Sequence, residues 1–287
     1  MTFVQSPSNP PQVESWHGQA QLIYQKQGEK TVPLVKTQAP LKVQRPFYPE
    51  GPQTCHTVLL HTAGGMVGGD SLSINITLEA DTAALVTTAA AAKIYSDHPQ
   101  RLPAQIQGHA QVGKGACLEW FPQESIVFEG AHYHPNWRID LAPEATWVGW
   151  DIVRLGRTAH GERFTQGEVR SQLEVWQHHR PIWIDPQQIL GSDALWSSPQ
   201  ALNQCPVLAT FAWVGQPVDI ACVQASRNCA QAIRQGAWGV TRLQQGLLCR
   251  YRGHSTSEAK RWFETVWAQL RPHYLGRSVV LPRVWQR

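Results

Sequence analysis

Apolar and polar residues alternate with period two along most of the chain. In residues 71–79, Leu72, Ile74, Ile76 and Leu78 alternate with polar residues. This spacing places one face of a strand against a core and the other toward solvent or a partner. Shorter runs of the same kind follow, separated by turns with Gly, Pro or Asn: AQIQGHAQV, ACLEWFP, SIVFEG, YHPNWRIDL and SQLEVWQ. The pattern predicts a mainly β protein with a large multi-stranded antiparallel β architecture.

Helical periodicity occurs only in the C-terminal part, where we expect about two α-helices. The segment STSEAKRWFETVWAQLRP has Ser255 three residues before Glu258, which is a capping-box pattern. Apolar residues then recur at helical spacing, and Pro272 is expected to end this helix. A weaker helix is expected over residues 225–235, with Gly236 as its stop. The segment TRLQQGLLCRYRG between them predicts a hairpin.

The ends and the composition of the chain indicate its organisation. Residues 1–12 are rich in Pro, Ser, Asn and Gln and predict a flexible tail, and residues 13–287 are expected to form a single domain. The tail lacks the features of a secretory signal, and no apolar run is long enough to cross a membrane. The 6 Cys include no C-x-x-C pair, so we expect a cytoplasmic protein with reduced thiols.

Charge and aromatic content bear on the class of partner. The net charge is only +4, and no dense run of Lys or Arg occurs, so nucleic acid is not expected to bind. The chain contains 13 Trp, a residue found both in cores and at protein interfaces.

The segment HTAGGMVGGD contains four glycines in six positions: Gly64, Gly65, Gly68 and Gly69. A phosphate-binding Walker A loop needs a Lys after its last glycine and then a helix. Here Asp70 takes that place and a strand pattern follows, so bound phosphate would be repelled. The spacing also differs from that of the dinucleotide fingerprint. We interpret the segment as a wide turn, in which Asp70 could cap backbone N–H groups.

His132 and His134 are the strongest candidates for metal ligands from the residues alone. A spacing of two on a strand puts both rings on one face. A cupin-type site would place a Glu where Arg138 and Ile139 stand. No nucleophile elbow and no HExxH motif occurs, so no coherent catalytic set exists and we expect a non-enzyme. A metal-dependent hydrolase on a β fold that uses the two histidines, or a carbohydrate- or peptide-binding module, remains open.

Five stretches, in this order, resemble the UreD family of urease accessory proteins, also called UreH. They are PLKVQRPFYPEG, GGMVGGDSL, TTAAAAKIY, LEWFPQESIVFEGA and PRVWQR. The resemblance runs from about residue 16 to the end. The chain departs from the family at Thr62 and Ala63, where prolines are usual, and in the alanine run of the third stretch. Both departures concern backbone shape more than chemistry.

The resemblance implies a nickel-insertion chaperone with a mainly β fold and helices in its C-terminal part. Implied partners are UreF, the GTPase UreG through UreF, and the urease structural subunits. No cofactor is expected to be tightly bound, and nickel is expected only in transit. The glycine loop, together with Lys93 and Tyr95 of the third stretch, is then a scaffold element, because GTP belongs to the partner.

Within this picture, we expect Asp70 to lie on the path of nickel, with Glu124 and Glu162 as companions. A Cys/His cage would trap nickel, whereas single carboxylates attract the cation and release it. Asp70 follows the glycines, Glu124 follows a turn-forming proline, and Glu162 lies in GRTAHGERF. We also expect Arg261 and Trp267, on the flank of the C-terminal helix, to contribute to the UreF surface.

Overall fold

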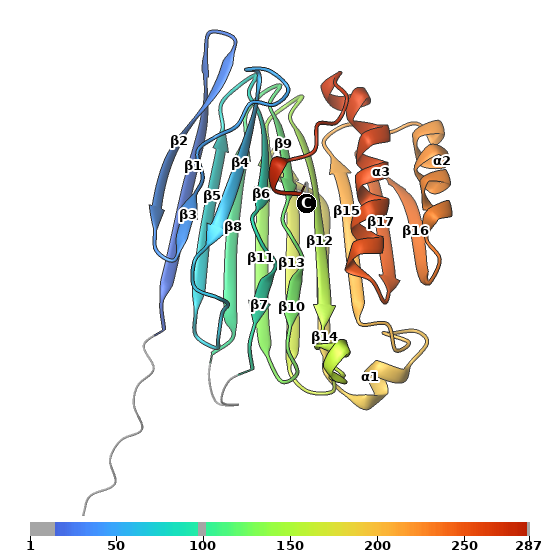
Figure 1. The fold of residues 1–287 in the computed structure, drawn as a ribbon. Coiled ribbons are helices and arrows are strands. Elements are labelled where there is room, and N and C mark those ends of the chain that lie inside the picture. Colours follow the sequence, from blue (N-terminus) through green and yellow to red (C-terminus); the bar gives the residue numbers. More distant parts are fainter. Residues whose placement is uncertain (1–14, 97–101, 286–287) are drawn as a thin grey trace, which may run out of the picture.

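Two β-sheets pack face to face, and helices cover one end of the second sheet (Figure 1). The computed structural model describes residues 15–96 and 102–285, so the expected tail over residues 1–12 lies outside the described part. The seven-stranded sheet has the order β14 (Arg180–Leu190), β13 (Glu168–Gln177), β11 (His132–Leu141), β8 (Ala104–Val112), β5 (Ser71–Leu78), β1 (His17–Gln27) and β2 (Lys30–Gln38).

The second sheet is ten-stranded. Its main path is β16 (Gly236–Leu243), β17 (Gly246–Gly253), β15 (Val207–Val214), β12 (Thr146–Leu155), β9 (Cys117–Phe121), β6 (Ala83–Thr88), β4 (Thr54–His61) and β3 (Leu41–Val43). Two short strands lie off this path: β7 (Ala92–Ile94) and β10 (Ser125–Val127). The hairpin expected near the C-terminus is confirmed, because β16 and β17 pair in antiparallel fashion with Leu243 opposite Gly246.

Between β4 and β13 the chain passes repeatedly from one sheet to the other. Strands β5, β8, β11 and β13 alternate in sequence with β4, β6, β9 and β12, and each set pairs in parallel within its own sheet. The prediction of a mainly β fold is confirmed, but a purely antiparallel architecture is wrong. Period-two alternation is the same for both strand directions, so it could not reveal the parallel pairing.

The core between the sheets follows the predicted alternation. In β5, Leu72, Ile74, Ile76 and Leu78 are all 5% exposed or less and belong to this core. The polar residues of the same strand point to the outer face of the seven-stranded sheet. Burial of such side chains contributes about 1.5–3 kcal/mol each, so the alternation fixes which face turns inward.

Three α-helices occur among the described residues, one more than expected: α1 (Asp193–Ser197), α2 (Ile220–Asn228) and α3 (Thr256–Leu275). Short 3₁₀ segments are η1 (Thr158–His160), η2 (Cys229–Ala232) and η3 (Arg283–Trp285). Helix α2 begins earlier than predicted, because the Asp219 side chain accepts a hydrogen bond from Cys222 N at 2.7 Å and caps it. No helix of the described part is long and apolar enough to span a bilayer.

Helix α3 starts where the sequence predicts but ends later. The Ser255 side chain accepts a hydrogen bond from Glu258 N at 3.1 Å, which confirms the N-cap. Pro272 does not end the helix, because it removes only one backbone N–H from the last turn. The helix continues to Leu275 and ends at Gly276, which has a left-handed conformation with φ of 67°.

The apolar face of α3 packs on the outer face of the ten-stranded sheet and forms a second core. Trp262, Phe263, Val266, Trp267 and Leu270 are at most 2% exposed. The expectation that Trp267 lies on the helix flank and is open to a partner is therefore wrong. Helical spacing places it on the same side as the core residues Phe263 and Leu270.

Candidate functional site

A cavity of about 400 Å³ lies between the two sheets. Both sheets contribute inward-facing side chains, and the glycine loop forms part of the wall. Aromatic groups make up much of the lining: Trp120, Trp137, Trp147, Trp150, Trp183 and Tyr133. A mostly apolar cavity with a few polar groups is the usual setting for a small ligand or ion.

The double glycine packs directly against the threonine–lysine motif. A Cβ at Gly65 would lie 2.3 Å from Cε2 of Tyr95 and 2.7 Å from the Lys93 carbonyl oxygen, so no larger residue fits. Met66 N donates to Lys93 O at 2.8 Å, and Tyr95 N donates to Met66 O at 2.9 Å. Gly64 and Gly65 line the cavity beside Lys93. The structure thus brings these two motifs together.

Asp70 closes the turn formed by Gly68 and Gly69. Its carboxylate is 1% exposed and accepts hydrogen bonds from Val67 N at 2.8 Å and from Trp16 N at 3.4 Å. Gly69 has φ of 89°, a conformation that the turn requires and glycine adopts readily. Asp70 is therefore a capping residue, and it is not among the residues that line the cavity.

His61, at the end of β4, lines the cavity beside the glycine loop. Its Nε2 is buried and has no hydrogen-bond partner among the described residues. Burial lowers the pKa of the imidazole, and the negative charge of Asp70 opposes this effect only in part. His61 is therefore held neutral, and neutral imidazole is the form that binds a metal ion. Sequence reasoning did not select His61, because its five-residue spacing from His56 suggested no shared site.

Glu124 and Glu162 do not line the cavity. Glu124 is half-buried between β9 and β10, and its carbonyl accepts a hydrogen bond from Ala92 N at 2.9 Å. Glu162 accepts hydrogen bonds from Arg157 N at 2.7 Å and from Arg157 Nε at 2.8 Å. The hydrogen bonds from the Arg157 side chain lower the pKa of Glu162 despite its partial burial. Their role on a nickel path stays a prediction.

The two histidines of β11 face away from the cavity. Tyr133 and Pro135 line the cavity, so His132 and His134, which alternate with them, lie on the outer face of the sheet. His134 Nε2 lies 3.2 Å from Glu168 Oε2. Within residues 15–96 and 102–285, no three His, Cys, Asp or Glu side chains are grouped closely enough to hold a metal ion. This arrangement does not support a hydrolase built on the two histidines.

Two carboxylates in the cavity wall were not identified from the sequence. Asp151 on β12 and Asp185 on β14 both line the cavity. Burial, together with the nearby charge of Asp185, raises the pKa of Asp151 from 3.8 to about 6. The available signal was the position of Asp151 within the apolar run TWVGWDIVRL, where a charge is costly.

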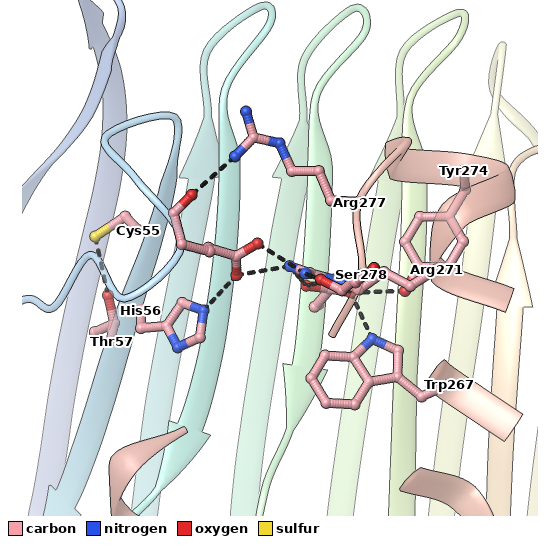
Figure 2. A network of polar contacts seen from close by, with 10 residues as sticks. Cys55, His56, Thr57, Trp267, Arg271, Tyr274, Arg277 and Ser278 are labelled. Atoms are coloured by element: carbon pink, nitrogen blue, oxygen red, sulfur yellow. Dashed lines mark hydrogen bonds and ion pairs between the residues drawn. The ribbon is translucent and has the colours of Figure 1, made fainter. Parts of the chain in front are cut away.

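A buried polar network joins α3 to the ten-stranded sheet and to the loop before β4 (Figure 2). Arg271 is fully buried and forms ion pairs with Glu119, at 3.0 Å, and with Glu50, at 2.7 Å. The Trp267 indole N–H and the Tyr274 hydroxyl also donate to Glu119, at 2.7 and 2.6 Å. Burial opposes the charge of Arg271, but the two carboxylates outweigh it and raise the pKa of the guanidinium.

The network extends to β4 through Glu50. His56 Nε2 lies 2.6 Å from Glu50 Oε1, and Arg277 donates to the Glu50 backbone carbonyl at 3.1 Å (Figure 2). Burial raises the pKa of Glu50, yet hydrogen bonds from His56 and Arg271 reverse this and lower it overall. The network therefore holds α3 in a fixed position over the sheet. Arg261, by contrast, is exposed on the opposite side of the helix.

Comparison with known proteins gives one consistent family. A family model described as UreD urease accessory protein matches residues 17–286. A curated protein named Urease accessory protein UreD from Nostoc punctiforme is 50% identical over 274 residues, which cover 95% of this chain and 97% of the relative. A protein of the same name from Acaryochloris marina is 48% identical over 273 residues, with 94% and 95% covered. A third, from Thermosynechococcus vestitus, is 46% identical over 274 residues, with 95% and 99% covered.

Proposed function

The chain belongs to the UreD family of urease accessory proteins, and on that premise we propose that it is a chaperone scaffold that helps to deliver nickel into the urease active site. It binds apo-urease and UreF in the cytoplasm, and the GTPase UreG joins through UreF. Nickel is cargo, and no cofactor stays tightly bound. The family consists of accessory proteins and not of enzymes, so no turnover is assigned to the chain itself.

The cavity between the sheets is the observation that best supports passage of nickel. His61 lines it beside the glycine loop, and Asp151 and Asp185 line it elsewhere. No three potential ligands are grouped within the described residues. Separate imidazole and carboxylate groups attract a divalent cation without enclosing it, so the ion can leave again. Asp70 does not line the cavity, but its negative charge acts on the imidazole of His61, which does.

A rigid helix on the surface supports the docking part of the proposal. The Arg271 network fixes α3, and Arg261 is exposed on its outer side. We retain Arg261 as a contact of UreF, whereas Trp267 can only support that surface from beneath. A preorganised surface binds with less loss of conformational entropy than a mobile one.

The test is co-expression of the urease structural subunits with UreF and UreG, with and without this chain. We expect purified urease to contain nickel and to hydrolyse urea only when the chain is present. The chain should also co-purify with UreF in the absence of urease. If urease acquires the same nickel content without the chain, the proposal is wrong.

A further inference from the structure

The cavity between the sheets meets a surface pocket beside the edge strand β14. This pocket, of about 270 Å³, is formed mainly by residues of β15, β16 and β17. Gln187 and Thr210 line both spaces. Asp185 lines only the cavity, whereas Arg250 lines only the surface pocket. The ion pair between Asp185 and Arg250 therefore lies across the boundary between the cavity and the surface pocket.

The two partners of this ion pair differ in their access to water. Arg250 donates hydrogen bonds to Asp185 and, at 2.9 Å, to the Thr210 hydroxyl. Gln187 Nε2 donates to the other Asp185 oxygen at 3.0 Å. The Asp185 side chain is 12% exposed, but that of Arg250 is 41% exposed. Arg250 can therefore swing into solvent at little desolvation cost, whereas Asp185 stays in the wall.

The inner side of the boundary has more negative than positive charge. Asp151 lines the same cavity and is close enough to Asp185 to feel its charge, which contributes to its raised pKa. Among the described residues, Asp151 forms no ion pair, because the Arg250 guanidinium pairs with Asp185 and not with Asp151. A divalent cation would neutralise both of them, because carboxylate oxygens are good ligands for such ions.

A second feature of the cavity points to a polar occupant. The indole N–H of Trp147 is buried, lines the cavity and has no acceptor among the described residues. Such a donor needs an acceptor inside the cavity, and a water molecule of a hydrated ion can provide one.

We propose that Asp185 and Arg250 form a gate between the surface pocket and the cavity, and that a divalent cation opens it by replacing the Arg250 guanidinium at Asp185. Asp151 then receives the cation on the inner side. Arg250 turns toward the solvent while the cation passes and returns to Asp185 afterwards. The inference rests on the proposed function only for the identity of the cation, which is nickel.

The test uses the full-length chain and Ni²⁺, with quenching of tryptophan fluorescence as the signal, because five tryptophans line the cavity. Arg250→Met should quench about fivefold faster than the parent, a factor that corresponds to about 1 kcal/mol of barrier for a partly exposed ion pair. Asp185→Asn should quench more slowly than the parent, because the attracting carboxylate is lost while Arg250 remains. Arg242→Met is the matched control. Arg242 is exposed on the adjacent strand β16 and lines neither the cavity nor the surface pocket.

The two substitutions are expected to change the quenching rate in opposite directions, and this distinguishes a gate from an ion pair that only stabilises the structure. If the ion pair only fastened β14 to β17, both substitutions would loosen the structure and change the quenching rate in the same direction. That result, or an Arg250→Met rate equal to that of Arg242→Met, would overturn the proposal. If Arg250→Met does not fold, Asp185→Asn alone tests the gate. Slower quenching than in the parent supports the gate, and faster quenching contradicts it. If the parent chain does not load urease with nickel in co-expression, the proposed function is wrong. The gate is tested separately, by the quenching rates.

Discussion

Arg271 is a single buried cation on which two buried carboxylates depend. It is fully buried and pairs with Glu50 and Glu119, which are 5% and 1% exposed at their side chains. We expect Arg271→Met to lower the free energy of unfolding by about 3–5 kcal/mol, because it leaves uncompensated charge in the interior. Urea unfolding monitored by fluorescence measures this. The exposed Arg261 on the same helix provides the control, since Arg261→Met should change stability by no more than about 0.5 kcal/mol.

Asp151 carries a charge that the fold disfavours, and this gives a pH-dependent prediction. Its pKa is about 6 in the folded chain against an ordinary value of 3.8, so ionisation opposes folding as the pH rises through this interval. We expect Asp151→Asn to be more stable than the parent by about 3 kcal/mol at pH 7.5. The difference should vanish below about pH 3, where Asp151 is protonated in both states. Thermal unfolding across this pH range measures it, and a pH-independent difference would contradict the assignment.

Asp70 can act as a capping residue and as a source of charge for His61, and one substitution separates these roles. Asp70→Asn keeps one capping oxygen but turns an amide toward Val67 N or Trp16 N, which should cost about 1 kcal/mol. If charge matters, the variant assembles with UreF and urease but delivers less nickel when nickel is limiting. Nickel analysis of the purified urease decides this. Full nickel loading by a folded Asp70→Asn chain would leave Asp70 as a turn residue only.

At the residue scale, the sequence predicted local chemistry better than distant partners. The Ser255 cap and the capping use of Asp70 follow from short-range patterns, and the structure shows both. The sequence did not indicate His61 or Asp185 as site residues, because the cavity that they line is formed by strands far apart in the sequence. Glu119 and Arg271 are 152 positions apart, so no local spacing could have paired them.

At the element scale, alternation predicts which side chains face inward but not which strand lies alongside. Residues 71–79 were assigned to the correct face, as the burial of Leu72 to Leu78 shows. The neighbours of β5 are β1 and β8, both parallel, while the next strand in sequence, β6, lies in the other sheet. The turn residues between short strands predicted antiparallel neighbours, yet most connections between β4 and β13 cross between the sheets. A parallel pair needs a long crossover, and here a strand of the opposite sheet provides it.

Helix α3 gives the prediction for partner binding. Its apolar side is already covered by the sheet, so a partner can meet only the outer side, where Arg261 is exposed. We expect Arg261→Glu to reduce co-purification with UreF without changing the thermal unfolding midpoint. The control is Arg170→Glu on the outer face of β13, where an exposed arginine receives the same change of charge. Equal recovery of UreF with both variants would exclude this side of α3 as the docking surface.

At the scale of the whole molecule, the packing of two sheets leaves an interior space that ordinary cores lack. Protein interiors are close-packed, so a cavity of about 400 Å³ between otherwise buried faces is costly and suggests a use. The sequence indicated large aromatic residues but could not show that their rings line a space instead of filling it. That outcome depends on how side chains from strands far apart in the sequence pack between the two sheets.

Filling the cavity tests whether this space is the route of nickel. Ser171 on β13 lines the cavity, and Arg170, next to it, is exposed on the outer face of the same strand. We expect Ser171→Trp to occupy part of the cavity, so that the chain still assembles with UreF and urease while the nickel content and activity of urease fall. Arg170→Trp adds the same side chain outside and should load urease as the parent does. If Ser171→Trp folds, assembles and delivers nickel at the parental rate, the ion does not pass between the sheets, and the chain must act on urease through its outer surfaces alone.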